Sequence, residues 1–445
     1  MDFLKKHWVV ISVVAVLLIA LIGFIVLHTF SGSGSSSGSG KATITMWGLF
    51  DTNEQMAPFI NTFEQAHPGI TIIYTEKNVT TYESDLLNAL AAGTGPDIFY
   101  IHNDWLPKYM DKMQPAPASV FSVANYETTF ADVAAGDFIS SQKIYAAPLG
   151  IDTLALYYNK DMLGSAGIAT PPQTWSDLVT DSQKISKIDS TGFFTKSGVA
   201  LGTTANLNRA QDIMYLLMLQ AGTAPYTSDY SQSTIDQAVN NSSSSSSSGG
   251  NQFPGAQALT FDTSFSNVFS NAYDWNTKSN YSTDAFADGQ LAMMYGYYYD
   301  EATILQKSPN LNFGVAPVPQ PTLGQNLVNY SNYWGYGVSK QTKTPNTDWE
   351  FIQSMTTKTA LEAYYKLDPQ PASRKDIISE QVSDPTFGVF ASSTLTSKNF
   401  YKADAAQVDT IVLNMIDDVN LRNKSVSTAL SNAAQQITAL SSGSQ

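Results

Sequence analysis

The sequence predicts an α/β protein whose strands form mostly parallel sheets, preceded by one transmembrane helix. Strands and helices alternate from residue 41 to residue 102, and a second series of such segments begins at residue 153. Apolar residues recur at every second position in the strands and at every third or fourth position in the helices. These two observations favour helices packed against sheets. The third observation, an uncharged apolar run over residues 8–27, favours a membrane-spanning helix.

The N-terminal segment has the length and charge pattern of an uncleaved membrane anchor. At about 1.5 Å per residue, a helix over this run spans a hydrocarbon core about 30 Å thick. A cleaved signal peptide would instead have a shorter apolar core and a small-residue cleavage site, which HTFSGSG does not provide. Lys5 and Lys6 precede the run, so we expect residues 1–7 in the cytoplasm, the anchor at 8–30 and the rest outside.

The folded part begins after SGSGSSSGSG, residues 31–40, which has the composition of a flexible linker. KATITMWGLF, ITIIYTEK and DIFYIH are predicted strands, separated by the predicted helices NEQMAPFINTFEQA and YESDLLNALAA. This β-α-β-α-β order predicts a parallel sheet that binds its ligand beyond the carboxyl ends of the strands.

A second α/β unit follows from residue 153. The strand TLALYYN precedes a helix that starts near Thr174, and another helix is expected at about 209–221. Residues 223–255 contain NNSSSSSSSGGN, a run that buries no apolar surface, and we expect a disordered insertion there. Helical segments are expected at about 348–367 and 404–440.

Composition and motifs exclude several classes of function. Acidic residues outnumber basic ones, 38 to 24, and the net charge of -14 repels nucleic acid, so we expect no nucleic-acid partner. The absence of cysteine excludes disulfides, thiolate nucleophiles and cysteine-bound metals. No two of the four histidines have metal-ligand spacing, and GxSxG, P-loop, HExxH and GxGxxG motifs are absent. Signals for an enzyme are therefore weak and metal catalysis is disfavoured, so we expect no enzyme activity, no metal and no cofactor.

Aromatic side chains and carboxylates follow several predicted strands and form the candidate ligand site. They are Trp47, Asp51, Asp104, Trp105, Asp152, Tyr297, Tyr298, Trp334 and Tyr336. A sugar ring stacks its apolar face on an aromatic ring, while its hydroxyls donate to carboxylates. The same groups could bind a polyamine through cation-π contacts, or two of the acids could cleave a glycosidic bond. Taken alone, Trp47 could lie in the core and Asp104 could cap a helix.

Several of these segments resemble a known family when they are taken in order. The matching pieces are ITMWGLFDTNEQMAPFINTFEQAHPGITI, LLNALAAGTGPDIFYIHNDW, YAAPLGIDTLALYYNKDML, PPQTWSDL, FADGQLAMMYGYYY, FGVAPVPQP, YWGYGVSK and PASRKDI. Together they resemble the extracellular solute-binding proteins of carbohydrate ABC importers, the maltose-binding-protein-like family 1. The resemblance implies two α/β lobes joined by a hinge: 41–151 plus about 331–375, and 152–330 plus about 376–445.

The resemblance also implies how the protein works. Gly150 and Asp152 would lie where the chain crosses between lobes, with Asp152 presented to the ligand. The ligand would be a sugar or oligosaccharide, and the partner an ABC permease, or a signalling protein if the receptor is a sensor. The anchor at 8–30 would hold a monomeric receptor at the membrane, next to that partner.

Overall fold

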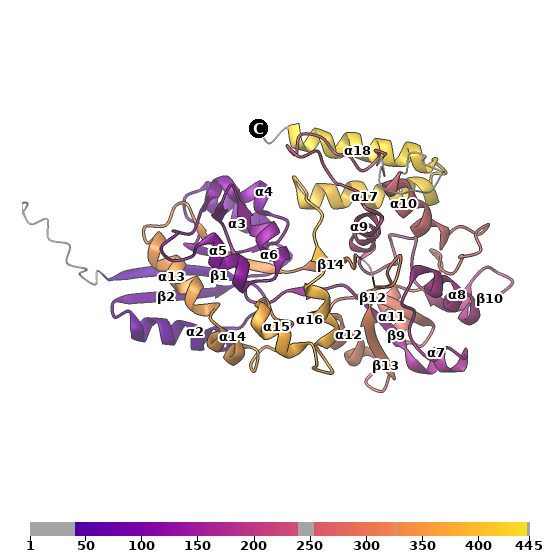
Figure 1. The fold of residues 1–445 in the computed structure, drawn as a ribbon, viewed down its shortest axis with the longest axis horizontal. Helices are drawn as coiled ribbons and strands as arrows, with labels where there is room; N and C mark the ends of the chain where they lie inside the picture. The colour runs from indigo at the N-terminus through magenta and orange to yellow at the C-terminus, as the bar shows by residue number, and fades with distance from the viewer. Residues whose placement is uncertain (1–40, 239–252, 325, 443–445) are drawn as a thin grey trace, which may run out of the picture.

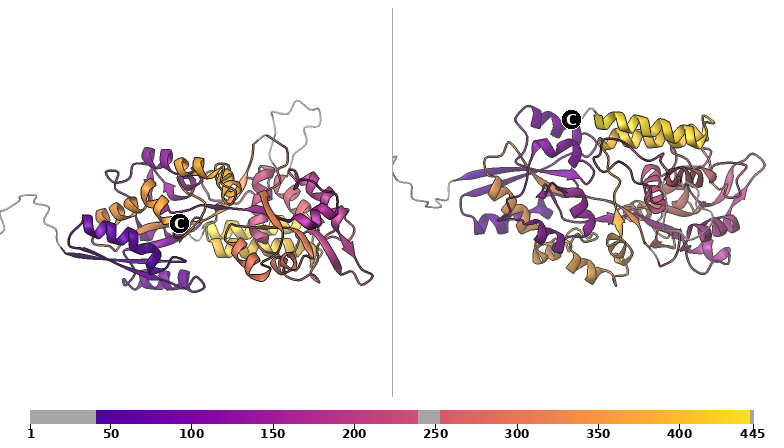
Figure 2. Two further views of the ribbon diagram at one scale, coloured as in Figure 1. Left: turned by 90° about the horizontal axis from the view of Figure 1, so that it is seen from below. Right: turned by 45° about the horizontal axis from the view of Figure 1, so that its top comes forward.

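The computed structural model describes residues 41–238, 253–324 and 326–442. Figure 1 shows two lobes side by side, with chain segments crossing between them. Figure 2 shows the same separation from two further sides. The predicted anchor at 8–30, the linker at 31–40 and the serine run NNSSSSSSSGGN at 240–251 lie outside the described residues. Within the described ranges, no helix combines the length and the apolar character needed to cross a membrane.

The first lobe, lobe 1, contains a six-stranded sheet with the order β2-β1-β3-β15-β4, in which β7 also pairs with β15. Its strands are β1 (Ala42–Gly48), β2 (Ile70–Glu76), β3 (Ile98–His102), β4 (Met113–Gln114), β7 (Ala147–Pro148) and β15 (Trp334–Ser339). β1 runs parallel to β2 and β3, with Ile44 opposite Ile72, so the predicted parallel unit is confirmed. The predicted helices are confirmed as α2 (Asn53–Ala66) and α3 (Tyr82–Ala91).

The second lobe, lobe 2, contains a five-stranded sheet with the order β10-β11-β12-β9-β13. Its strands are β9 (Ala155–Asn159), β10 (Lys187–Ile188), β11 (Phe194–Val199), β12 (Leu291–Gly296) and β13 (Phe313–Pro317). Of its strand pairs, β11 with β12 is parallel and the other three are antiparallel.

The prediction of mostly parallel sheets is therefore wrong for lobe 2, and in lobe 1 it holds for β1, β2 and β3. β9 and β15 each follow a crossing between the lobes, so each starts near the hinge and runs away from it. β3 and β12 run toward the hinge. The strand entering each lobe therefore lies antiparallel to its neighbour: β15 to β3, and β9 to β12.

Helices cover both sheets. In lobe 1 they are α4 (Leu106–Tyr109), the 3-10 helix η1 (Met110–Lys112), α5 (Val123–Thr129), α6 (Asp132–Phe138), α13 (Pro345–Met355), α14 (Lys358–Tyr364) and α15 (Lys375–Gln381), with a hairpin of β5 (Ile139–Ser140) and β6 (Lys143–Ile144). In lobe 2 they are α7 (Lys160–Ser165), α8 (Trp175–Ile185), α9 (Ala210–Ala221), α10 (Pro254–Ser264), α11 (Ser282–Ala287), α12 (Asp300–Lys307), α17 (Ala405–Asn420) and α18 (Val426–Ser442). Thr174 caps α8 in a capping box with Asp177, so the predicted helix start near Thr174 is confirmed.

Three crossing segments form the hinge. A small sheet joins β8 (Asp152–Thr153), β14 (Asn329–Asn332) and β16 (Ser397–Lys398), with β14 in the centre. α16 (Gly388–Thr394) packs beside this sheet. Gly150 lies just before β8, where a Cβ atom would be 2.0 Å from Gln370 Oε1 and 2.9 Å from the Pro371 carbonyl oxygen. The crossing therefore requires glycine for close approach of the backbone.

Each lobe has its own hydrophobic core. The first core draws on residues 44–151 and 333–378 plus Ala391, and the second on 154–330 plus Phe390 and residues 400–437. Ile377 and Ile378 of α15 belong to the first core, so the expected boundary at 375 falls too early. This happens because α15 packs against α5 and α14 of lobe 1 before the chain crosses at α16.

The described part of the predicted insertion at 223–255 is ordered, which corrects that prediction. Tyr226 and Ile235 are buried in the second core, and an isolated bridge joins Tyr226 to Ser233. Pro254 begins α10. These few apolar residues hold residues 223–238 against α18 and its neighbours, where Ser233 N donates to Thr438 Oγ1 at 3.0 Å. Residues 239–252 lie outside the described ranges.

Candidate functional site

A cavity of about 590 Å³ lies between the lobes, beside the hinge. The lobe 1 side includes the aromatic residues Phe50, Tyr100, His102, Trp334 and Tyr364 with the acids Asp51 and Asp368, and the lobe 2 side includes Asp152, Arg209, Tyr298 and Tyr299. A smaller cavity of about 240 Å³ adjoins it, and His102, Arg209 and Asn332 line both. The two cavities therefore form one cleft that is divided by these three side chains.

The structure brings six of the nine predicted site residues to this cleft. Asp51, Asp152, Tyr298 and Trp334 line the larger cavity. Asp104 and Trp105 line the smaller one. They converge because β1 and β3 of lobe 1 end at the hinge, while β15 begins there and so places Trp334 at its first position.

The other three predicted residues lie outside both cavities, which corrects the predicted set. Trp47 lies under the ammonium of Lys77, 4.0 Å from its ring centroid. Tyr297 is buried, and its hydroxyl donates to Asp212 at 3.0 Å. Tyr336 is buried two positions further along β15, where it stacks on Tyr100 at 4.1 Å.

An aromatic wall covers the lobe 1 side of the cleft. The Trp334 ring lies 5.0 Å from the rings of both His102 and Trp105, in edge-to-face geometry. Tyr100 and Phe50 pack against the same indole at 5.7 and 6.0 Å. Such packing holds the indole of Trp334 in one orientation, half-buried and lining the cavity.

The carboxyl groups of the larger cavity are held by hydrogen bonds from the protein. Burial raises the pKa of Asp51 to about 7, although the hydroxyl of Tyr364 donates to its Oδ1 and opposes the shift. Burial also raises the pKa of Asp152 well above its usual range. The Asp152 carboxylate accepts from the backbone N–H of Thr153 and of Tyr298, both at 2.8 Å. Asp152 therefore both caps a turn and lines the cavity.

A buried charge cluster joins the lobes at the smaller cavity. Asp104 lies 2.5 Å from His102 Nδ1 and 2.9 Å from Lys402 Nζ. Burial by itself would raise the pKa of Asp104, but the charges of His102 and Lys402 hold it well below its usual range. Burial opposes the charged form of His102, but the charge and hydrogen bond of Asp104 raise the His102 pKa.

Arg209 is a site residue that the sequence analysis missed. It lines both cavities, and its guanidinium carbon lies 5.4 Å and 5.3 Å from the rings of Tyr297 and Tyr299. Its backbone has φ 61°, a left-handed value that arginine seldom adopts. The one signal in the sequence is a cation directly before an apolar helix, in NLNRAQDIMYLL, and this pattern is too common to identify a site.

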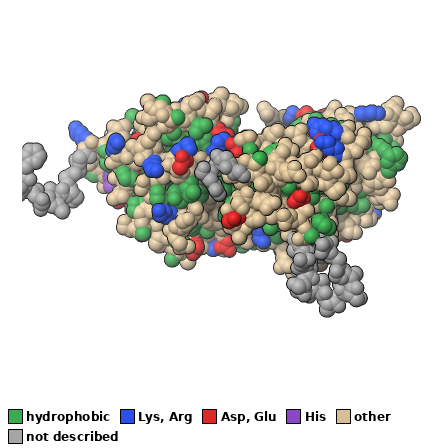
Figure 3. Space-filling model, turned by 90° about the horizontal axis from the view of Figure 1, so that it is seen from above, with side chains coloured by type: hydrophobic (Ala, Val, Ile, Leu, Met, Phe, Trp, Pro, Cys, Tyr) green, Lys and Arg blue, Asp and Glu red, His purple; other side chains and the backbone are tan. Residues whose placement is uncertain are grey.

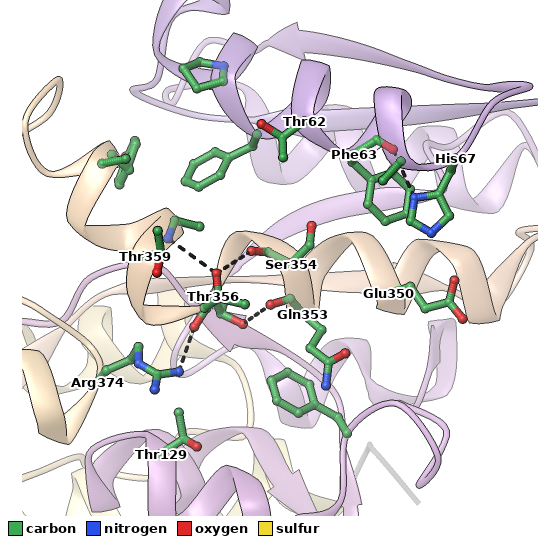
Figure 4. Close-up of a pocket in the computed structure, with 18 of the residues that line it drawn as sticks. Thr62, Phe63, His67, Thr129, Glu350, Gln353, Ser354, Thr356, Thr359 and Arg374 are labelled. Carbon is green, nitrogen blue, oxygen red and sulfur yellow. Dashed lines mark hydrogen bonds between the residues drawn. The ribbon is translucent and has the colours of Figure 1, made fainter.

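A larger cavity, about 830 Å³, is lined by residues of lobe 1, and Tyr364 lines both this cavity and the larger cavity of the cleft. Figure 4 shows it between α2, α13 and α14, with Arg374 pointing to the end of α13. The polar groups there bond to one another: Arg374 Nη1 donates to the Thr356 carbonyl at 3.0 Å, and Thr356 Oγ1 donates to the Gln353 carbonyl at 3.0 Å. The cleft has an ordered aromatic wall and an arginine whose side chain makes no hydrogen bond within the described part of the chain, so it is the better candidate for the ligand site.

Known proteins match this chain in sequence and in fold. The family model described as bacterial extracellular solute-binding protein matches residues 51–362. A binding protein of Brucella abortus (strain 2308) is 23% identical over 267 residues, which are 59% of each chain, so the match spans under two thirds of that relative. The maltodextrin-binding protein of Bacillus subtilis (strain 168) is 22% identical over 419 residues, 92% of each chain.

The fold has solved counterparts. The crystal structure of the cyclic alpha-maltosyl-1,6-maltose binding protein from Arthrobacter globiformis has a TM-score of 0.72 and 19% identity, and the match covers 91% of this chain and 100% of that one. This agreement in fold extends over nearly the whole described chain and so includes both lobes. With the family model matched over most of the folded region, the chain belongs to the bacterial extracellular solute-binding protein family.

Proposed function

We propose that this protein binds a sugar or oligosaccharide in the interlobe cleft and delivers it to an ABC permease. The observation that supports this proposal most strongly is the aromatic wall around Trp334 in lobe 1. Hydrogen-bonding side chains of lobe 2 line the same cavity of about 590 Å³. A flat ring above a row of polar groups matches a pyranose, which has apolar faces and a polar edge. The printed functions of the relatives, maltodextrin binding among them, support this choice.

Binding would proceed by closure about the hinge. A ligand first stacks on Trp334 of lobe 1, because the indole is already fixed by its aromatic neighbours. Contacts from Asp152, Arg209 and Tyr298 of lobe 2 then favour the closed state. The three crossings at β8, β14 and β16 would take up the rotation, while each core moves as a unit. The sites proposed to contact ligand are the six predicted residues at the cleft, together with Arg209.

The proposed membrane anchor is compatible with the position of β1. Figure 1 shows that β1 begins at the end of lobe 1 that is far from lobe 2. A tether at 31–40 attached there would leave the cleft and the hinge free. A ten-residue linker of this composition reaches on the order of 20 Å. Fractionation of cells that produce the full chain tests this: recovery in the membrane after a high-salt wash supports an anchor, and release into the medium contradicts it.

The alternatives fit the cleft less well. A polyamine would have to bind beside the guanidinium of Arg209, a like charge. A glycosidase needs one free carboxyl acid and a second free carboxylate, whereas Asp51 and Asp152 are both engaged by protein donors. Membership of a family of binding proteins also supports the proposal that the protein is not an enzyme. A sensor would use the same cleft and differ in the protein that docks outside it.

A ligand screen on the full chain in detergent tests the proposal. Mono- and oligosaccharides, amino acids and polyamines are compared by thermal shift, since a ligand at 100 times its Kd stabilises the fold by about 2.7 kcal/mol. The expected hit is a carbohydrate that is recovered intact, with affinity reduced at least about 30-fold by Trp334→Ala, as for a central aromatic contact. Phe269→Ala, at a fully exposed ring, is the control. Stabilisation by polyamines alone, or turnover of the sugar, would contradict the proposal.

A further inference from the structure

The cleft contains a cation with no partner in the protein. Arg209 is half-buried and borders both cavities. Among the residues that the structure describes, no acidic side chain is close enough to form an ion pair with it, and its buried Nε has no hydrogen-bond partner. Its nearest neighbours are the rings of Tyr297 and Tyr299. Guanidinium groups carry five N–H donors, so a half-buried one without acceptors is poised to bind an acceptor from the cavity.

The two acids nearest to Arg209 are committed to other groups. Asp212 Oδ2 accepts from the Tyr297 hydroxyl at 3.0 Å. Asp300 Oδ2 accepts from the Tyr297 backbone N–H at 2.9 Å and from Asn208 at 3.4 Å. These carboxylates offset the charge of Arg209 at longer range without occupying its N–H groups. The N–H donors of the Arg209 guanidinium therefore remain available to a ligand.

The backbone adds to the positive potential at this point. Arg209 is the N-cap residue of α9, and its side chain, unlike that of Ser or Asp, offers no acceptor to the first turn. The amino end of a helix carries a partial positive charge. The left-handed backbone of Arg209 also has a conformational cost, of a kind that is often found at functional sites. The positive charge of the Arg209 guanidinium and the partial positive charge at the start of α9 therefore lie in the same region of the cleft.

The acids that line the larger cavity repel an anion less than their number suggests. Burial raises the pKa values of Asp51, Asp152 and Asp368, so each of these carboxyl groups keeps its proton to a higher pH than an exposed carboxyl group does. On the lobe 1 side, His102 faces Arg209 across the border between the two cavities and has a raised pKa of its own. The smaller cavity also contains Glu83, Asp104, Asp212 and Asp409, and both His102 and Lys402 are paired with Asp104 there. Among the described residues that line the two cavities, Arg209 is therefore the cation without an ion-pair partner.

We propose that the carbohydrate bound in this cleft is acidic and that Arg209 binds its single carboxylate, as in a uronic acid residue of an oligosaccharide. This inference rests on the proposed function and narrows the class of ligand. One planar guanidinium matches one carboxylate through two parallel N–H···O bonds, and the other cations of the cleft, His102 and Lys402, are already paired with Asp104. Because cavity space lies on both sides of Arg209, the acidic ring would have a neighbouring ring on at least one side.

The experiment compares matched acidic and neutral ligands on the full chain in detergent. Pools of oligogalacturonates, alginate oligosaccharides and glucuronate-bearing xylo-oligosaccharides are screened beside neutral malto-, manno-, xylo- and galacto-oligosaccharides and beside phosphorylated sugars. The best acidic hit is then titrated by calorimetry together with its neutral methyl ester. We expect an acidic hit that binds roughly 30-fold or more tightly than its ester, as for a desolvated charge pair.

Two arginine variants test whether Arg209 causes the preference for the acidic ligand. Arg209→Met should bring the affinities for the acid and for its methyl ester to within a few-fold of each other, and a thermal-unfolding midpoint close to that of the wild type shows that the variant is folded. Arg422→Met removes one arginine from a partly exposed pair with Asp418 on α17 and should leave the preference intact. A cleft that prefers neutral or phosphorylated sugars, or an acid preference that persists in Arg209→Met, would overturn this inference and leave the receptor function standing. No stabilisation by any carbohydrate pool would overturn both.

Discussion

Lys402 Nζ lies 2.9 Å from Asp104 Oδ2, and this buried ion pair joins the two lobes. Asp104 follows β3 of lobe 1, whereas Lys402 follows the last crossing and also contacts Asp409 of α17, at 2.8 Å, in lobe 2. Both side chains are almost fully buried, at 2% and 4% exposure. Lys108 and Asp404 form a second pair between the lobes at 3.0 Å, closer to the surface. On the face seen in Figure 3, acidic and basic side chains are scattered among uncharged atoms.

Breaking the Lys402 pair should destabilise the fold. Lys402→Met leaves the Asp104 carboxylate buried with one cationic partner, His102, and we expect a loss of about 3 kcal/mol in the free energy of unfolding. Lys424→Met removes a partly exposed lysine that pairs with Asp418, and its expected loss is below about 1 kcal/mol. Urea denaturation measures both variants. Equal, small losses would show that the buried pair does not hold the lobes together.

Gly150 should tolerate no side chain. Gly150→Ala places a methyl group on Gln370 and on the Pro371 carbonyl, which is backbone and cannot rotate away, so we expect a loss of about 1–3 kcal/mol and weaker ligand binding through a displaced hinge. Gly164→Ala in α7 meets no atom within 4 Å and should be neutral or stabilising by about 0.5–1 kcal/mol. Thermal unfolding and ligand titration of both variants check this. Unchanged stability of the Gly150 variant would refute the close approach.

Asp51 should make stability depend on pH below neutrality. Its pKa rises from 3.8 to about 7 on folding because the carboxyl is buried. The stabilising contribution of the protonated carboxyl is therefore fully present below about pH 4 and is lost as the pH rises toward 7. Asp51→Asn mimics the protonated form and should flatten the decline in unfolding free energy between pH 5 and pH 7. Asp111→Asn, at an exposed acid, should keep the slope of the wild type. Identical slopes in all three proteins would contradict the prediction.

Asp152 should contribute to stability as well as to binding. Asp152→Ala leaves the N–H groups of Thr153 and Tyr298 without their acceptor, at a cost of about 1–3 kcal/mol. Asp152→Asn keeps one acceptor oxygen and should lose less. Calorimetric unfolding, paired with ligand affinity, separates the two roles. If both variants are as stable as the wild type but bind ligand more weakly, Asp152 serves binding alone.

Most secondary structure follows from local sequence. Apolar spacing and the capping box at Thr174 indicate the elements from β1 to β3 and the start of α8, since these signals act within one turn or one strand. Strand direction in lobe 2 could not be obtained in this way. β9 lies antiparallel to β12 because of the point at which the chain enters the lobe, which depends on contacts more than a hundred residues apart.

Local sequence also places part of the candidate site. A strand end brings its residues to the hinge edge of a sheet, so Asp51, Asp104 and Trp334 could be placed near the cleft from their order in the chain. Which face a side chain takes depends on packing, and this separates Tyr298 at the cavity from Tyr297 in the core.

The sequence by itself determined the α/β elements, the acidic charge, the lack of cysteine chemistry and the family resemblance, because each depends on residue type and local spacing. Only the tertiary structure decided the antiparallel entry strands, the Asp104–Lys402 pair 298 residues apart in the chain, and the exposure of Arg209 to the cleft. These features arise when distant segments exclude water from a shared interior, where an ion pair is strengthened and an unpaired donor becomes costly.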